Sequence, residues 1–120
     1  MYTPRSLSEH PRHRQLAKLI ENATKRSKAS KRKCTLDDDW VRWALTQDIC
    51  PLTGLRIDWS DRRSRSAPGP LAPSIDRIEP LEGYTPENTR IVCHFANIAK
   101  SVWTDAEFTL LVLASAKNIG

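Results

Sequence analysis

The sequence predicts a small α+β fold, a mainly helical domain built around a β-hairpin that runs into a short helix. Two runs rich in β-branched residues, 74–78 and 90–92, flank a loop that contains glycine and proline. From His94 onwards apolar residues recur every three or four positions, which is the spacing of a helix. The 120 residues are the length of one domain, so we expect residues 1–120 to form a single domain.

Residues 10–33 are expected to form a basic helical arm at the N-terminal side of this core. The segment holds nine Lys or Arg residues against the single acid Glu21, and its apolar residues lie at helical intervals. Pro11 suits the first turn of such a helix. The arm either lies along a phosphate backbone or is a solvated face that keeps the protein soluble. Its candidate phosphate contacts are Lys25, Arg26, Lys28, Lys31, Arg32 and Lys33.

A second helix is expected over residues 35–49. Thr35 can cap its free N–H groups, and the acids that follow complement the positive end of the helix dipole. Consecutive residues on a helix point in different directions, so Asp37, Asp38 and Asp39 are poorly arranged to share one metal ion. We expect one face of this helix to enter the core rather than stack on bases, and that face carries Leu36, Trp40, Trp43 and Ala44.

Residues 58–73 lack any periodicity and are rich in arginine and proline, so they are expected to form a loop. Arg62, Arg63 and Arg65 lie in it, shortly before the first strand of the hairpin. These arginines either bind nucleic-acid phosphates or belong to a mobile, solvated loop. The sequence leaves the two alternatives equal.

A C-terminal helix is expected over residues 104–117. Thr104 and Glu107 have the spacing of a capping box ahead of an apolar run. The apolar stripe is wide because Leu110 and Leu113 fall outside the main face. We expect this helix to pack into the core, with a face for a partner as the alternative.

The order and spacing of four residues resemble the HNH nuclease motif, also called the ββα-metal or His-Me finger motif. The residues are Asp76, Asn88, Asn97 and Lys100, within the hairpin and helix at 74–101. The wording Ser-Ile-Asp-Arg-Ile and Ala-Asn-Ile-Ala-Lys is similar to a phage-associated branch in which Asp-Arg replaces Asp-His. The resemblance implies that Asp76 and Asn97 bind a metal ion, that Asn88 fixes the loop, and that Lys100 contacts nucleic acid.

Arg77 stands where the family has its catalytic histidine. A guanidinium stays protonated, so Arg77 cannot be a general base, but it can bind the scissile phosphate and stabilise its charge. The base must then be another group. His94 is a candidate because it lies three residues before Asn97, on a neighbouring helical position.

In the family, two pairs of cysteines form a zinc knuckle. Each pair keeps only one cysteine in this sequence, because Thr53 stands in place of the partner of Cys50 and Ala96 in place of the partner of Cys93. Two thiolates make a poor site for a structural zinc ion, which needs four ligands. We expect Cys50 and Cys93 to be small buried apolar residues, with structural zinc unlikely to bind. Three widely spaced cysteines also do not form a disulfide framework, which fits a reducing, intracellular compartment.

Together these observations lead to two hypotheses. The first is a metal-dependent DNA endonuclease with one Mg²⁺ or Mn²⁺ ion, encoded by a phage or prophage and possible as a homodimer. The second is a catalytically degenerate DNA-binding module on the same scaffold. Both take DNA as the partner and neither takes a membrane, because no apolar run approaches the ~20 residues that span a bilayer.

Overall fold

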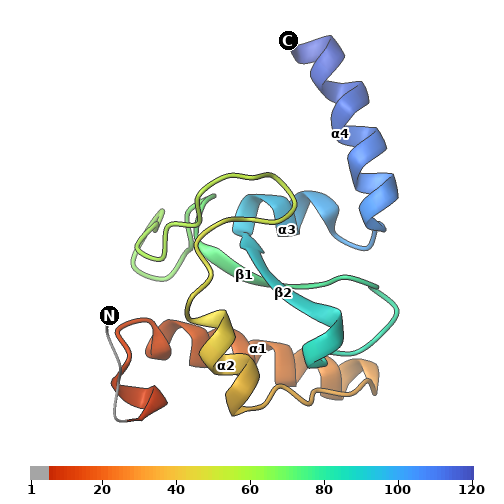
Figure 1. Cartoon of the computed structure of the whole chain (residues 1–120). Coiled ribbons are helices and arrows are strands. Elements are labelled where there is room, and N and C mark those ends of the chain that lie inside the picture. Colours follow the sequence, from red (N-terminus) through yellow and green to blue (C-terminus); the bar gives the residue numbers. More distant parts are fainter. Residues whose placement is uncertain (1–5) are drawn as a thin grey trace.

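The computed structural model describes residues 6–120, which form the α+β arrangement expected of the sequence. Its two strands pair as an antiparallel hairpin, with α1 and α2 on one side and α3 on the other (Figure 1). The elements in chain order are η1 (Leu7–Glu9), α1 (His13–Ser30), α2 (Asp38–Ala44), β1 (Pro73–Arg77), η2 (Pro86–Asn88), β2 (Thr89–Cys93), α3 (His94–Lys100) and α4 (Asp105–Ile119).

The register of the hairpin decides which side chains share a face. Pro73 pairs with Cys93 at one end of the hairpin, and Arg77 pairs with Thr89 at the other. Successive side chains on a strand point to opposite faces. Asp76 therefore points towards α3, where it contacts Lys100, while Arg77 points towards the side of α1.

The loop between the strands is fixed by one side chain and one glycine. Asn88 accepts a hydrogen bond from the N–H of Glu79 at 2.8 Å and donates to the carbonyls of Glu79 and Gly83 at 3.1 and 2.9 Å. A Cβ atom on Gly83 would lie 2.5 Å from the carbonyl oxygen of Lys33. Glycine thus permits the close approach through which Tyr84 N–H donates to Lys33 O at 2.8 Å.

Helix α1 lies within the expected basic arm, and its buried residues Leu16, Ala23 and Ser27 recur at helical intervals. It begins at His13, so Pro11 falls in the preceding turn rather than in the first helical turn. Lys31 ends the helix in the left-handed conformation, with φ 59°. The Lys, Arg and Glu side chains of α1 lie on its outer surface, opposite the buried residues.

Helix α2 is shorter than the expected 35–49. Its N-cap is Asp37, whose carboxylate accepts the N–H of Trp40 at 2.9 Å, so the expected cap at Thr35 is wrong. Trp40 and Ala44 are buried as expected, but Trp43 is 42% exposed. A helix of seven residues makes only two turns, and its narrow buried face leaves Trp43 at the edge.

The segment 58–73 holds no helix, and strand β1 begins at its last residue, Pro73. Asp61 organises the loop by accepting the N–H of Leu71 at 2.7 Å. A Cβ atom on Gly69 would overlap the Asp61 side chain, so this packing requires glycine. The arginine-rich tip of the loop is exposed.

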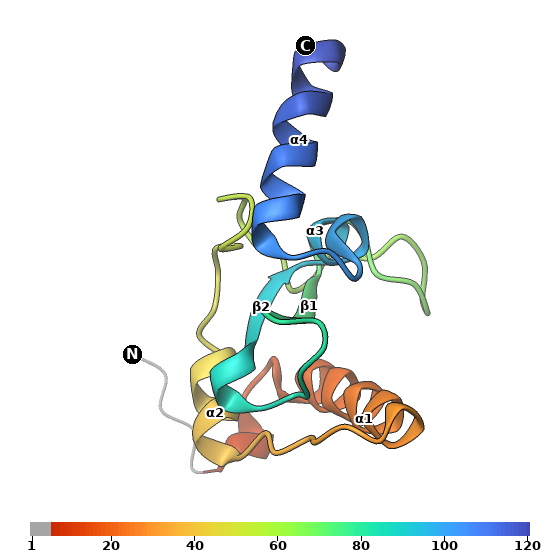
Figure 2. The same ribbon diagram turned by 90° about the vertical axis from the view of Figure 1, so that its right-hand side faces the viewer.

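Helix α4 departs most from expectation. Its capping box is present, with Thr104 and Glu107 exchanging hydrogen bonds of 2.9 and 3.2 Å. Phe108 is its one buried residue among those described, so the expected packing of this helix into the core is wrong. Figures 1 and 2 show α4 projecting away from the hairpin. The radius of gyration is accordingly 14.9 Å, against about 13.6 Å for a compact chain of this length.

The apolar core lies mainly between α1, α2 and the hairpin. It includes Leu16, Trp40, Ile75, Ile91 and Val92. Across residues 6–120, no helix is long and apolar enough to cross a membrane.

Candidate functional site

The carboxylate of Asp76 lies at the centre of a buried ionic network. Its Oδ2 accepts from Arg90 Nε at 2.9 Å and from Lys100 Nζ at 3.1 Å, and its Oδ1 lies 3.3 Å from the same Nζ. Asp76 is 2% exposed and Lys100 is fully buried. Lys100 also donates to the carbonyls of Arg77 at 2.8 Å and Ile78 at 3.2 Å. Both oxygens of Asp76 are therefore in contact with cations.

Asp105, at the start of α4, completes this network. Its Oδ1 lies 2.6 Å from Arg90 Nη2 and 3.1 Å from Lys100 Nζ. Burial opposes ionisation of Asp105, but Arg90 and Lys100 hold its pKa below the ordinary value. Burial likewise acts to lower the pKa of Arg90, but hydrogen bonding to Asp105 and the charge of Asp76 raise it. Two carboxylates and two cations leave the cluster neutral.

Asn97 lies on the same face of the hairpin as Asp76, but its side chain contacts Ser74. The Nδ2 atom donates to Ser74 Oγ at 2.6 Å and to the carbonyl of Ile75 at 3.3 Å. Helix α3 thus runs along β1, with Asn97 over Ser74 and Lys100 over Asp76. The hairpin and helix bring Asp76 and Asn97 to one face, with Lys100 in contact with the carboxylate.

Arg77 points to the opposite face and forms a basic corner with Arg26 and Tyr84. The guanidinium of Arg77 lies 5.0 Å from the centre of the Tyr84 ring, and that of Arg26 lies 5.6 Å from it. Arg26 Nε also donates to the Tyr84 hydroxyl at 3.0 Å. Among the described residues, no carboxylate forms an ion pair with either arginine. The corner therefore presents two uncompensated positive charges.

His94 is the first residue of α3, beside the Pro73 end of the hairpin. Arg77 lies at the other end, four residues along β1, or about 13 Å at the rise of a strand. The structure does not bring these two candidate catalytic residues together. His94 lies about one helical turn from Asn97 on α3, but at the opposite end of the hairpin from Arg77.

The expected nucleic-acid contacts on α1 and in the following turn are all exposed, as are Arg62, Arg63 and Arg65. Lys25 forms an ion pair with Glu21 at 3.3 Å. Lys100 is the exception, because its ammonium is fully buried among carboxylates and carbonyls. It is not available to touch a phosphate, so the expectation that Lys100 contacts nucleic acid is wrong for this arrangement.

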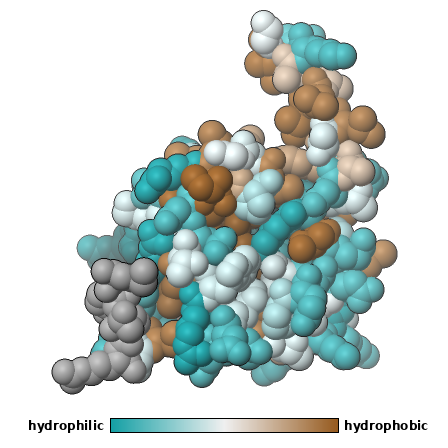
Figure 3. All heavy atoms as spheres, in the orientation of Figure 1, coloured by the Kyte–Doolittle hydropathy of each residue, from teal (hydrophilic) through white to brown (hydrophobic). Residues whose placement is uncertain are grey.

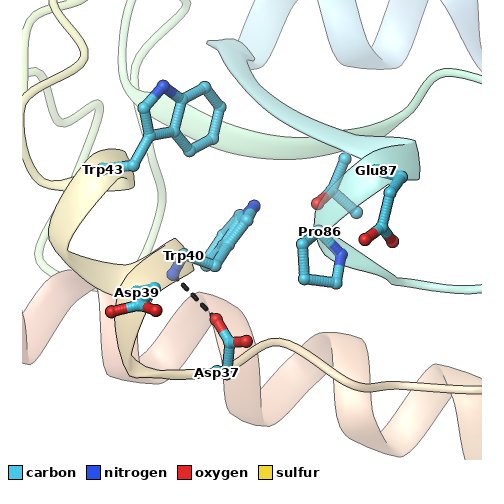
Figure 4. Close-up of a pocket in the computed structure, with 7 residues that line it drawn as sticks. Asp37, Asp39, Trp40, Trp43, Pro86 and Glu87 are labelled. Carbon is cyan, nitrogen blue, oxygen red and sulfur yellow. Dashed lines mark hydrogen bonds between the residues drawn. The ribbon is translucent and has the colours of Figure 1, made fainter.

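A pocket of about 370 Å³ lies between α2 and η2, on the Arg77 side of the hairpin. Figure 4 shows Trp40 and Trp43 on one wall and Pro86 and Glu87 on the other. Asp37 and Asp39 also line it. Asp37, Asp39 and Glu87 give the pocket three carboxylates, of which Asp39 forms an ion pair with Arg42 at 2.9 Å. Because carboxylates repel a phosphate, we do not include this pocket in the candidate surface for nucleic acid.

A comparison with solved structures decides the fold. The chain is similar to the rare-cutting HNH restriction endonuclease PacI, with a TM-score of 0.62 and 21% sequence identity over 85% of this chain and 77% of that one. The chain has the HNH nuclease fold. No protein-family profile and no curated protein matches the sequence.

The resemblance to HNH nucleases implies a divalent cation, but the residues present do not fit one in this arrangement. The donors are suitable in kind, since Mg²⁺ prefers carboxylate and carbonyl oxygens. Lys100 and Arg90, however, occupy the Asp76 carboxylate, and they would repel a divalent ion. Within residues 6–120, no cluster of three or more His, Cys, Asp or Glu residues is arranged to hold a metal.

The turn at residues 50–54, where the resemblance predicted the remnant of a zinc knuckle, packs with Cys93 as apolar core. Gly54 has φ +73°, and its N–H donates to the carbonyl of Cys50 at 2.8 Å. Cys50 and Cys93 are fully buried, and Thr53 Oγ1 lies 3.9 Å from Cys93 Sγ. Burial raises the pKa of the Cys93 thiol. Burial also acts to raise the pKa of Cys50, but hydrogen bonds from Thr53 and from backbone groups lower it.

Sequence reasoning missed Arg90 and Asp105 as partners of the central carboxylate. Arg90 stands directly opposite Asp76 in the hairpin, so an assumed register would have found it. The contact of Tyr84 with both Arg26 and Arg77 was also not predicted. That arrangement depends on the approach of α1 to the loop, which no local pattern in the sequence encodes.

Proposed function

We propose that this protein is nuclease-like and acts on DNA, gripping the phosphate backbone through α1 and the corner formed by Arg26, Tyr84 and Arg77. The observation that carries the proposal is the uncompensated positive charge of this surface. Lys28, Lys31 and Lys33 are exposed, and no carboxylate forms an ion pair with them in the described part of the chain. Each phosphate that they neutralise releases counterions and favours binding.

The corner also fixes the orientation of two of the positive charges. Tyr84 holds two guanidinium groups against one ring, which limits the freedom that they lose on binding a phosphate. Planar guanidinium groups suit phosphate oxygens because they donate two parallel hydrogen bonds. The fold shared with an HNH restriction endonuclease supports DNA as the ligand.

Two more specific functions are compatible with binding of the DNA backbone at this surface. A DNA-binding module without hydrolysis is favoured by the ion pairs that occupy Asp76, and we place it first on that ground. A metal-dependent endonuclease, of the phage-associated branch with Asp-Arg, is favoured by the HNH fold and by the position of Asp76 and Asn97 on one face. Cleavage would require Lys100 and Arg90 to release the Asp76 carboxylate.

Binding is tested by fluorescence anisotropy of a labelled duplex at several salt concentrations. Replacing Lys28, Lys31 and Lys33 by alanine should weaken binding to all sequences, and reduce the slope of log affinity against log salt by roughly one for each phosphate that is no longer neutralised. The matched control is Lys117→Ala on α4, which should leave the slope unchanged. A wild-type protein that does not bind DNA at low salt would overturn the proposal.

Cleavage is tested on supercoiled plasmid with Mg²⁺, with Mn²⁺ and with a chelator. The binding module predicts no nicking under any condition while salt-sensitive binding persists. The endonuclease predicts nicking that the chelator and Asp76→Asn abolish, and that Arg77→Ala slows by orders of magnitude, which is more than the loss of one phosphate contact in the corner explains. In a protein that binds without cleaving, a gain of activity in Arg77→His would identify the absent base as the cause.

A further inference from the structure

Helix α4 leaves an unusually large apolar surface open to solvent. From Phe95 onwards, nine large apolar side chains on α3, α4 and the turn between them are 46% to 84% exposed. Figure 3 shows this apolar surface over the projecting helix. A covered aromatic side chain buries 150–250 Å² and an aliphatic one somewhat less, so nine large side chains exposed by about half or more present on the order of 1,000 Å² in total. The largest apolar patch on a typical monomer is only about 300–600 Å².

The helix itself indicates that something covers it. A helix of 15 residues is marginal in water by itself, because most helical stability in proteins comes from packing of an apolar face. In α4 that packing is limited to Phe108 and to the ionic contacts of Asp105. Apolar residues occur on every side of the helix, which is typical of a helix buried on more than one face.

One side of α4 forms a groove with α3. The groove has a volume of about 550 Å³, and its walls include Phe95 and Trp103 from the α3 side and Phe108, Leu111, Val112 and Ser115 from α4. None of the side chains that line it is charged. Leu110 and Leu113 lie on the opposite side of the helix, because the 100° step between residues turns them away.

We infer that a second copy of this chain covers the groove, with the two α4 helices packed against each other about a two-fold axis. A two-fold interface uses the same patch on both copies, so an uncharged groove meets an uncharged groove. This neutrality matters in a chain of net charge +5, whose copies otherwise repel each other. Neither this inference nor its test depends on DNA binding.

The groove side supplies the larger part of the area that such a dimer needs. A stable interface buries about 800 Å² on each partner. Five of the nine exposed side chains line the groove and present on the order of 500 Å², and the small residues between them and the rim of the interface add the rest. The interfaces of obligate homodimers are more apolar than those of transient complexes. A heterologous partner would have to match a groove that offers neither a charged side chain nor, apart from Ser115, a side-chain hydroxyl for recognition. A second copy already carries that uncharged apolar surface.

The test is sedimentation of the 120-residue protein and of two variants that differ only in the side of α4 that they change. Leu111 and Leu113 are 55% and 58% exposed, so a glutamate at either position is tolerated by the fold to a similar degree. We expect wild type to sediment at twice the chain mass of 13.6 kDa at micromolar concentration. Leu111→Glu should weaken the dimer at least a hundredfold, and Leu113→Glu by less than tenfold.

The outcomes separate the occupants of the groove. Helical circular dichroism of both variants in the monomeric range checks that the fold is kept. A monomeric wild type at all concentrations overturns the inference and leaves a different protein as the occupant. Equal loss in both variants, or a larger loss in Leu113→Glu, overturns the groove as the interface. Open-ended association of wild type excludes a two-fold interface.

Discussion

Lys100 is a buried charge that the fold keeps for structure. Its ammonium lies within 3.3 Å of two carboxylates and two backbone carbonyls, with no exposed surface. A charge out of water is tolerated only when it is paired and hydrogen-bonded. Lys100 therefore fixes α3 to the end of β1.

The first prediction concerns this residue. Lys100→Ala leaves two carbonyls without a partner and two carboxylates with Arg90 alone, so we expect a loss of about 3–5 kcal/mol in the free energy of unfolding. Urea denaturation followed by circular dichroism measures it. Lys117→Ala, at an exposed position, should stay within about 0.5 kcal/mol of wild type. A loss below about 1 kcal/mol for Lys100→Ala would contradict the structural role.

The position of Lys100 also marks the limit of what its motif predicts. The spacing of Asp76, Asn97 and Lys100 predicted a hairpin that runs into a helix, and the structure has both. That Asp76 and Asn97 bind one cation stays a prediction. The spacing did not reveal that the lysine turns inward, because that depends on how α3 lies along β1. The separation of His94 from Arg77 follows from strand register, which neither residue encodes.

Among the elements, the short helix α2 depends on its cap. The carboxylate of Asp37 accepts the N–H of Trp40, and Trp40 is the aromatic residue that α2 places in the core. A helix of two turns has few hydrogen bonds of its own, so a single cap carries a large share of its stability.

The second prediction compares two candidate caps. Asp37→Ala should cost about 1 kcal/mol of unfolding free energy, with a range of about 0.5–2, because it frees a backbone N–H at the helix start. Thr35→Ala should cost less than about 0.5 kcal/mol, since its side chain is exposed and outside the helix. Thermal or urea denaturation of both variants decides between them. The reverse order would restore the cap that local sequence suggested.

The third prediction concerns the attachment of α4. Arg90 and Lys100 hold the pKa of Asp105 below its ordinary value of 3.8, so its ionised form stabilises the fold. That contribution is complete above pH 3.8 and is lost as the pH falls through the lower pKa of the folded protein. Asp105→Asn should reduce stability at neutral pH and flatten its dependence on pH below 4. Acid titrations of both proteins by circular dichroism test this.

Helix α4 also shows why the sequence predicts the presence of a helix better than it predicts what that helix packs against. The capping box at Thr104 and Glu107 and the apolar run after it predicted a helix, and the structure has one. The width of the stripe, with Leu110 and Leu113 added, is the same for a helix buried in its own chain and for one covered by another copy. The sequence therefore could not tell the core from an interface.

At the scale of the whole molecule, the two exposed surfaces lie at opposite ends. Figure 2 shows α1 at one end of the molecule and α4 projecting from the other, with the hairpin between them. A dimer joined through α4 would carry its two basic α1 helices apart, on the far sides of the pair.

The fourth prediction follows from that separation. On a duplex long enough to reach both α1 helices, the dimer gains from bivalent binding, so Leu111→Glu should weaken binding roughly 10²-fold or more. On a duplex too short to bridge them, the same variant should bind as well as wild type. Anisotropy titrations with both lengths measure the difference. Equal affinities of wild type and variant on the long duplex would contradict the arrangement.

The ionic cluster has one more consequence, which is thermodynamic reciprocity. Asp105 begins α4, and the two cations that it shares with Asp76 lie on α3 and β2. Any ligand of Asp76 that draws Lys100 away also alters the anchor of α4, and with it the affinity of one copy for another. Linkage requires that association of the two copies change the affinity at Asp76 by the same factor. Ligand binding at Asp76 in the hairpin and association of two copies through α4 are therefore thermodynamically coupled.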